Sequence, residues 1–79
     1  MSEIFDLLDR NPDISGGKPI IKGTRISVAL VLEWLATGGS PEKINEAYPN
    51  ISVEAVYQSL WYASRELSSI EYIQLPVAV

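Results

Sequence analysis

The stretch GGKPIIKGTRISV, residues 16–28, decides the fold of this chain, because it combines extended-chain residues with turn residues in a short span. The β-branched pair Ile20-Ile21 is typical of a strand, and Gly23 permits the chain to reverse. Thr24-Arg25-Ile26 then has the composition of a second extended segment. We therefore predict a small β-hairpin that the later segments support.

The same stretch is locally basic. Lys18, Lys22 and Arg25 are three of the six basic residues in the chain, and no acidic residue accompanies them. Backbone N–H groups and cationic side chains can approach an anion together at such a segment, so it suits DNA phosphates or carboxylates. The alternative is a solvated hairpin whose lysines serve only solubility. The candidate DNA contacts within the stretch are Lys18, Lys22, Thr24 and Arg25. Lys43 is a further candidate beyond it.

The composition favours a binding module. The chain has 79 residues, of which 47% are hydrophobic, and it contains neither cysteine nor histidine. Thiol nucleophiles, imidazole bases and nearly all zinc sites are thereby excluded, and the acidic residues are scattered singly. We expect no catalytic residues, no metal and no cofactor. Because so small a domain buries little of its surface, we expect a homodimer or a second protein to cover part of it.

The N-terminal segment MSEIFDLLDRNPD, residues 1–13, is acidic where a signal peptide needs a basic start and an unbroken apolar run. No segment reaches membrane-spanning length, so we expect a cytoplasmic protein without membrane contact. The apolar run Ile4–Leu8 fits a short strand beside Ile20-Ile21, with a helical turn packed over the core as the alternative. A turn follows at Asn11-Pro12-Asp13.

The first helix is expected to begin after Ser27 as N-cap and to end at Gly38-Gly39. Its core-facing residues at helical spacing are Val28, Val31, Leu32 and Leu35. Leu30 and Trp34 lie on a second side, because each residue turns the helix by ~100°. They are candidate partner contacts and the basis for expecting self-association. The alternative is that Trp34 covers the hairpin.

Two further helices are expected after Ser40-Pro41 and after Ser52, each serine acting as N-cap. A short helix, a turn and a longer helix form the outline of a helix-turn-helix, which many three-helix bundles share. The longer helix opens with SVEAVYQ, which lacks Arg and Lys, so only Gln58 is expected to read a base, adenine. The residues expected to face the core from this helix are Val53, Val56, Tyr57, Leu60, Ser64 and Leu67.

The apolar tail, residues 70–79, follows Ser68-Ser69 and is a candidate partner-binding segment. Ile73, Leu75 and Val77 alternate like one face of a strand, which suits pairing with a sheet edge. The tail could equally fold back on its own hairpin or on another subunit. We expect residues 1–69 to form the folded domain.

With these elements placed, the stretch 16–28 and the later run GGSPEKINEAYPNISVEAVYQSLWYA resemble domain of unknown function family 433, the VapB-like antitoxins. The resemblance covers Asp13 to Ala63, and Ser27 stands where the family often has proline. It implies a helix-turn-helix antitoxin, often encoded beside a PIN-like ribonuclease toxin that it neutralises while the complex represses its own operon. The expected fold class is mainly α, a three-helix homeodomain-like helix-turn-helix bundle with a small N-terminal β-hairpin.

The net charge opposes DNA binding unless charge is segregated, because it is −4 with a pI of about 4.5. We therefore expect weak, phosphate-directed binding to operator DNA that dimerisation would strengthen. The alternative function is a free-standing homodimeric DNA-binding regulator, and a purely structural oligomer is the third possibility.

Overall fold

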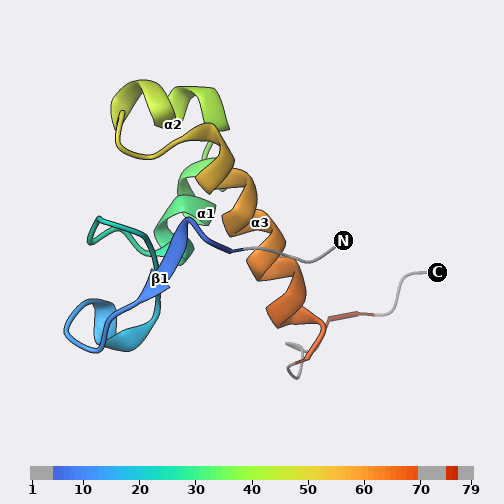
Figure 1. Cartoon of the computed structure of the whole chain (residues 1–79). Coiled ribbons are helices and arrows are strands. Elements are labelled where there is room, and N and C mark those ends of the chain that lie inside the picture. The colour runs from blue at the N-terminus through green and yellow to red at the C-terminus, as the bar shows by residue number, and fades with distance from the viewer. Residues whose placement is uncertain (1–4, 70–74, 77–79) are drawn as a thin grey trace.

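The computed structural model describes residues 5–69 and 75–76, and it is mainly helical. Its elements in chain order are β1 (Leu8–Arg10), a 3-10 turn η1 (Ser15–Gly17), β2 (Pro19–Ile21), α1 (Val28–Ala36), α2 (Pro41–Ala47) and α3 (Val53–Leu67). In Figure 1, α3 is the longest element, α2 lies near its N-terminal end, and β1 lies near α1. The expected class, three helices with a small N-terminal hairpin, is confirmed.

The three helices begin where serine caps were predicted. Ser27, Ser40 and Ser52 are the N-caps of α1, α2 and α3, and each hydroxyl accepts a hydrogen bond from the backbone N–H three residues later. The three distances are 3.0, 3.1 and 3.1 Å. Each bond satisfies a donor that the first helical turn leaves unpaired and stabilises the helix by about 1 kcal/mol.

The sheet pairs β1 with β2 in antiparallel register, with Leu8 opposite Ile21 and Arg10 opposite Pro19. The prediction that an N-terminal strand lies beside Ile20-Ile21 is therefore correct, but the strand begins at Leu8 rather than Ile4. Phe5 lies before it in a turn, where its carbonyl accepts a hydrogen bond from the N–H of Leu8 at 3.1 Å.

The prediction of a second strand at Thr24-Arg25-Ile26 is wrong. This segment meets β2 only through an isolated bridge between Ser27 and Ile20 and a hydrogen bond from the N–H of Ile21 to the carbonyl of Ile26 at 2.8 Å. The cause lies in the turn, because Gly23 has φ +80° and the hydroxyl of Thr24 bonds to the backbone on either side, which holds the segment as a closed loop.

The core draws on both strands and all three helices. Val31, Ile51 and Val56 are completely buried. The remaining buried members of the cluster are Leu8, Ile21, Val28, Ile44 and Ala55. Each contributes roughly 1–3 kcal/mol by leaving water. This one cluster holds the hairpin against α1 and α3.

The prediction of the core-facing side of α3 is only partly correct. Val56 is fully buried, but Tyr57, Leu60 and Leu67 are 49%, 41% and 52% exposed. The buried side consists of Ala55, Val56, Gln58 and Ser59. This side of α3 packs against α1, α2 and β1, while the larger apolar residues point outward.

Within the described ranges 5–69 and 75–76, no helix combines the length and apolar character that crossing a membrane requires. Of the predicted tail contacts, Ile73 and Val77 lie outside the described residues, and Leu75 is 72% exposed.

Candidate functional site

The loop that connects β2 to α1 is closed by its own hydrogen bonds. The N–H of Thr24 donates to the carbonyl of Ile21 at 3.0 Å, and its Oγ1 donates to the same carbonyl at 2.8 Å. The N–H of Ile26 in turn donates to Oγ1 of Thr24 at 3.0 Å. Gly23 adopts φ +80°, which only glycine occupies without strain. Thr24 therefore holds the loop that presents Arg25, rather than offering a free hydroxyl.

A second turn stands opposite this loop. The side-chain oxygen of Asn11 accepts a hydrogen bond from the N–H of Asp13 at 2.9 Å, and its carbonyl accepts one from Ile14 at 2.9 Å. This confirms the turn predicted at Asn11-Pro12-Asp13. Further support comes from Arg10, whose Nε donates to the carbonyl of Gly17 at 2.7 Å. Both sides of the site are thus fixed by local hydrogen bonds.

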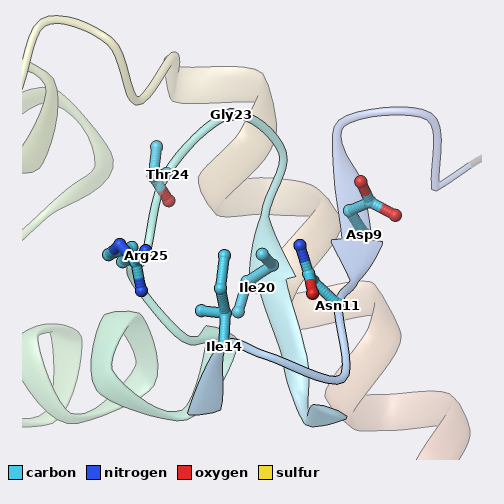
Figure 2. A pocket seen from close by; sticks show the side chains of 7 residues that line it. All are labelled: Asp9, Asn11, Ile14, Ile20, Gly23, Thr24 and Arg25. Atoms are coloured by element: carbon cyan, nitrogen blue, oxygen red, sulfur yellow. The ribbon is translucent and has the colours of Figure 1, made fainter.

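A hollow of about 460 Å³ lies between the two turns. In Figure 2, Arg25 stands on one side, Asp9 and Asn11 stand on the other, and Ile14 and Ile20 lie between them. Thr24 and Gly23 complete its lining. The hollow therefore presents a guanidinium, a carboxylate and an amide around an apolar floor, a combination that suits a polar macromolecular surface with charges of both signs.

The cationic side chains of the stretch 16–28 are open to solvent, and of these only Arg25 lines the hollow. Lys18, Lys22 and Arg25 are all exposed. Arg25 has no ion pair with any residue that the structure describes, so an internal salt bridge does not occupy it. Its guanidinium is available to fork onto two oxygens of a phosphate or carboxylate.

Two further candidate DNA contacts, Lys43 and Gln58, do not line the hollow. Lys43 is on α2, which Figure 1 shows apart from the hairpin. Gln58 is buried, its Oε1 accepts from the N–H of Leu7 at 3.0 Å, and its Nε2 donates to Oδ1 of Asp6 at 2.9 Å. Reading a base would require breaking both hydrogen bonds, so Gln58 is left out of the proposed site.

The two candidate partner contacts on α1 differ in exposure. Leu30 is 37% exposed. Trp34 is partly buried against the core, and its ring stacks on that of Tyr48 with centroids 4.9 Å apart and planes 3° apart. Trp34 therefore packs on the end of α2, a contact that was not expected from the sequence, and its role as a partner contact stays a prediction.

Sequence reasoning missed Asp9 and Asn11 as lining residues of the hollow. The available signal was the turn at Asn11-Pro12, which marks where β1 must end. Their position opposite Arg25 depends on the pairing of β1 with β2, which the sequence pattern did not fix. Within residues 5–69 and 75–76, no group of three acidic side chains gathers where it could hold a metal ion.

Three comparisons place the chain among known proteins. The family described as "Protein of unknown function (DUF433)" matches residues 8–63. The uncharacterized protein y4eO of Sinorhizobium fredii (strain NBRC 101917 / NGR234) is 36% identical over 58 residues, which are 73% of this chain and 26% of that protein. This chain therefore spans about a quarter of the length of y4eO.

A solved structure shares the fold. The crystal structure of a DUF433 member protein from Anabaena variabilis ATCC 29413, at 2.00 Å resolution, superposes with a TM-score of 0.72 at 21% identity. The match covers 78% of this chain and 61% of that one. At this identity the likeness concerns the fold alone.

Proposed function

The chain belongs to the DUF433 family of proteins of unknown function, and from this premise we propose that it is the antitoxin of a type II toxin–antitoxin pair. In this role it neutralises a PIN-like ribonuclease and, with that partner, binds operator DNA. It acts as a binding module and not as an enzyme.

The observation that carries the proposal is the amount of apolar surface on so small a domain. Seven large hydrophobic side chains of the described residues are between 37% and 72% exposed, and these are Leu30, Tyr48, Tyr57, Leu60, Trp61, Leu67 and Leu75. Contiguous exposed apolar surface on a small domain marks sites of protein–protein contact. This supports a chain that functions in a complex.

The basic loop supplies a chemical reason for a nuclease partner. Arg25 and Lys22 are exposed on a turn that local hydrogen bonds hold in place. A nuclease that binds metal ions does so with a cluster of carboxylates, and a guanidinium pairs with carboxylates through two parallel hydrogen bonds. Insertion of this loop at such a cluster would block access of the RNA phosphates, while the apolar tail around Leu75 adds contact area.

Contact with operator DNA would use the same charges through phosphates. Lys18, Lys22 and Arg25 are exposed near one another in the chain, whereas the first turn of α3 carries Glu54 and no cation. Binding of this kind depends on electrostatics and falls with salt. The exposed basic loop also favours a second candidate function, that of a free-standing homodimeric DNA-binding regulator.

Co-purification of the native operon products tests the proposal and separates the two functions. An affinity-tagged full-length chain, expressed from its own operon, is expected to retain a small nuclease in stoichiometric amount. As a matched pair, Arg25→Gln should lower the yield of the nuclease, whereas Ala29→Gln, an exposed position on α1, should not. Binding to operator DNA without any retained nuclease would contradict the antitoxin function and support the regulator.

A further inference from the structure

The hollow between the two turns contains polar side-chain groups that have no partner among the residues that the structure describes. Asn11 uses its side-chain oxygen for the N–H of Asp13, which leaves its amide nitrogen free to donate. Asp9 uses one carboxylate oxygen for the N–H of Arg10 at 2.8 Å, which leaves the other oxygen free to accept. The guanidinium of Arg25 bonds to no described residue. All three groups are therefore available to a ligand.

The charges of Asp9 and Arg25 border the hollow on opposite walls and do not pair with each other. Both residues line the hollow, and Figure 2 shows them on either side of Ile14 and Ile20. Neither forms an ion pair with any residue in the described ranges 5–69 and 75–76. A ligand that enters between the walls meets a positive charge on one side and a negative charge on the other.

A DNA backbone is a poor match for this arrangement. Every phosphate is negative, so a strand that reaches Arg25 also approaches the carboxylate of Asp9, which repels it. The floor formed by Ile14 and Ile20 offers a phosphate no hydrogen bond to replace those it makes with water. The hollow therefore disfavours a ligand whose charges are all negative.

A protein segment can match every part of the hollow. An acidic side chain pairs with the guanidinium of Arg25, and a cationic side chain pairs with Asp9. A backbone carbonyl accepts from the amide of Asn11, and an aliphatic side chain covers the apolar floor. At about 460 Å³ the hollow is within the size range of protein pockets that enclose a ligand.

We propose that the hollow docks a segment of mixed charge on the proposed nuclease partner, and that Asp9 is the residue that favours this partner over DNA. The docking rests on the proposed function, whereas the discrimination against DNA can be measured on the chain alone. Lys18 is exposed and does not line the hollow, so it stays available for phosphates when the hollow is filled. Arg25 and Lys18 thus serve different ligands in the complex.

The first experiment measures DNA binding by the full-length chain alone. Asp9→Asn removes the charge but retains the oxygen that accepts from Arg10. Fluorescence anisotropy with a duplex of random sequence is expected to show about five-fold tighter binding at about 50 mM salt, a gain that is lost near about 500 mM. The control Glu54→Gln causes the same change in net charge on α3 and should alter the affinity by less than about two-fold.

The second experiment measures capture of the co-expressed nuclease by the tagged chain. Asp9→Asn and Arg25→Gln should each weaken the complex by about ten-fold, since each leaves a charge of the partner unpaired. Ala29→Gln, an exposed position on α1, is the control. Asp9→Asn is thus expected to bind DNA more tightly and the nuclease more weakly, whereas a variant that fails to fold would lose both ligands.

Each part of the proposal has a result that would overturn it. Unchanged or weaker DNA binding by Asp9→Asn would remove the discrimination, and so would an equal gain from Glu54→Gln, which would place the DNA on α3. Full capture of the nuclease by Asp9→Asn would remove the docking and leave the proposed function standing. Failure of the proposed function looks different, because the unmodified chain itself then retains no nuclease. The docking falls with it, while tighter DNA binding by Asp9→Asn still upholds the discrimination.

Discussion

The side-chain carbonyl of Gln58 in α3 accepts a hydrogen bond from the backbone N–H of Leu7 at 3.0 Å, across 51 positions of sequence. The same amide donates to Asp6 at 2.9 Å. These two bonds fasten the segment before β1 to the middle of α3. Gln58 is thus a structural residue, and the hairpin that presents the basic loop depends on it.

Gln58→Ala is predicted to lower the free energy of unfolding by about 1–3 kcal/mol, because the N–H of Leu7 loses its acceptor in a partly buried place. Urea denaturation followed by circular dichroism measures it. Glu54→Gln, on the exposed side of the same helix, is the control and should change stability by less than about 0.5 kcal/mol. Equal stability of the two variants would contradict the structural role of Gln58.

Thr24→Val is predicted to destabilise the chain by about 1–2 kcal/mol, because it removes a hydroxyl that both donates to Ile21 and accepts from Ile26. Thr24→Ser retains the hydroxyl and should lose less. Thermal unfolding of the three proteins side by side is the measurement. A valine variant as stable as the serine variant would show that the loop does not depend on these hydrogen bonds.

The sequence predicted the helices better than their packing. The three serine caps and the glycine and proline breaks are local signals, so the bounds of α1, α2 and α3 follow from them. The core-facing side of α3 does not follow, because the helix carries two apolar sides and the larger residues occupy the outer one. The partners of Gln58 and the hollow beside Arg25 depend on contacts between distant segments, which periodicity cannot show.

Arg25→Lys is predicted to weaken binding of DNA or of the proposed nuclease partner, while the thermal midpoint moves little. Arg25 makes no ion pair with any described residue, so replacing it breaks no ion pair within the fold. The cause of the weaker binding is that lysine offers a point charge where arginine forks onto two oxygens. A large loss of stability with unchanged binding would show that Arg25 stabilises the fold and does not contact DNA or the partner.

Binding to duplex DNA is predicted to fall with salt, and Arg25→Gln should reduce the logarithmic salt slope by about one unit. Fluorescence anisotropy across a salt series measures the slope. Lys43→Gln serves as the control, because Lys43 lies on α2 apart from the hairpin. This substitution should leave the salt slope of DNA binding unchanged. Affinity that stays constant between low and physiological salt would contradict phosphate contact.

Truncation after Ser69 is predicted to reduce capture of the nuclease, because alternating apolar residues in the tail suit a sheet edge of the partner. The remaining domain retains the whole buried cluster and should keep its fold. Circular dichroism and a binding titration, performed on the same preparation, distinguish a tail that binds the partner from a tail that belongs to the fold. Lost stability or a lost dimer with full capture of the nuclease would assign the tail to the fold.

Inhibition of the proposed ribonuclease partner tests the proposed antitoxin function most directly. In a titration of the purified PIN-like nuclease with this chain, RNA cleavage is predicted to fall to the background level near equimolar ratio. Arg25→Gln should shift the titration to higher concentrations. Undiminished cleavage in the presence of a large excess of the folded chain, with no complex on gel filtration, would contradict the antitoxin function.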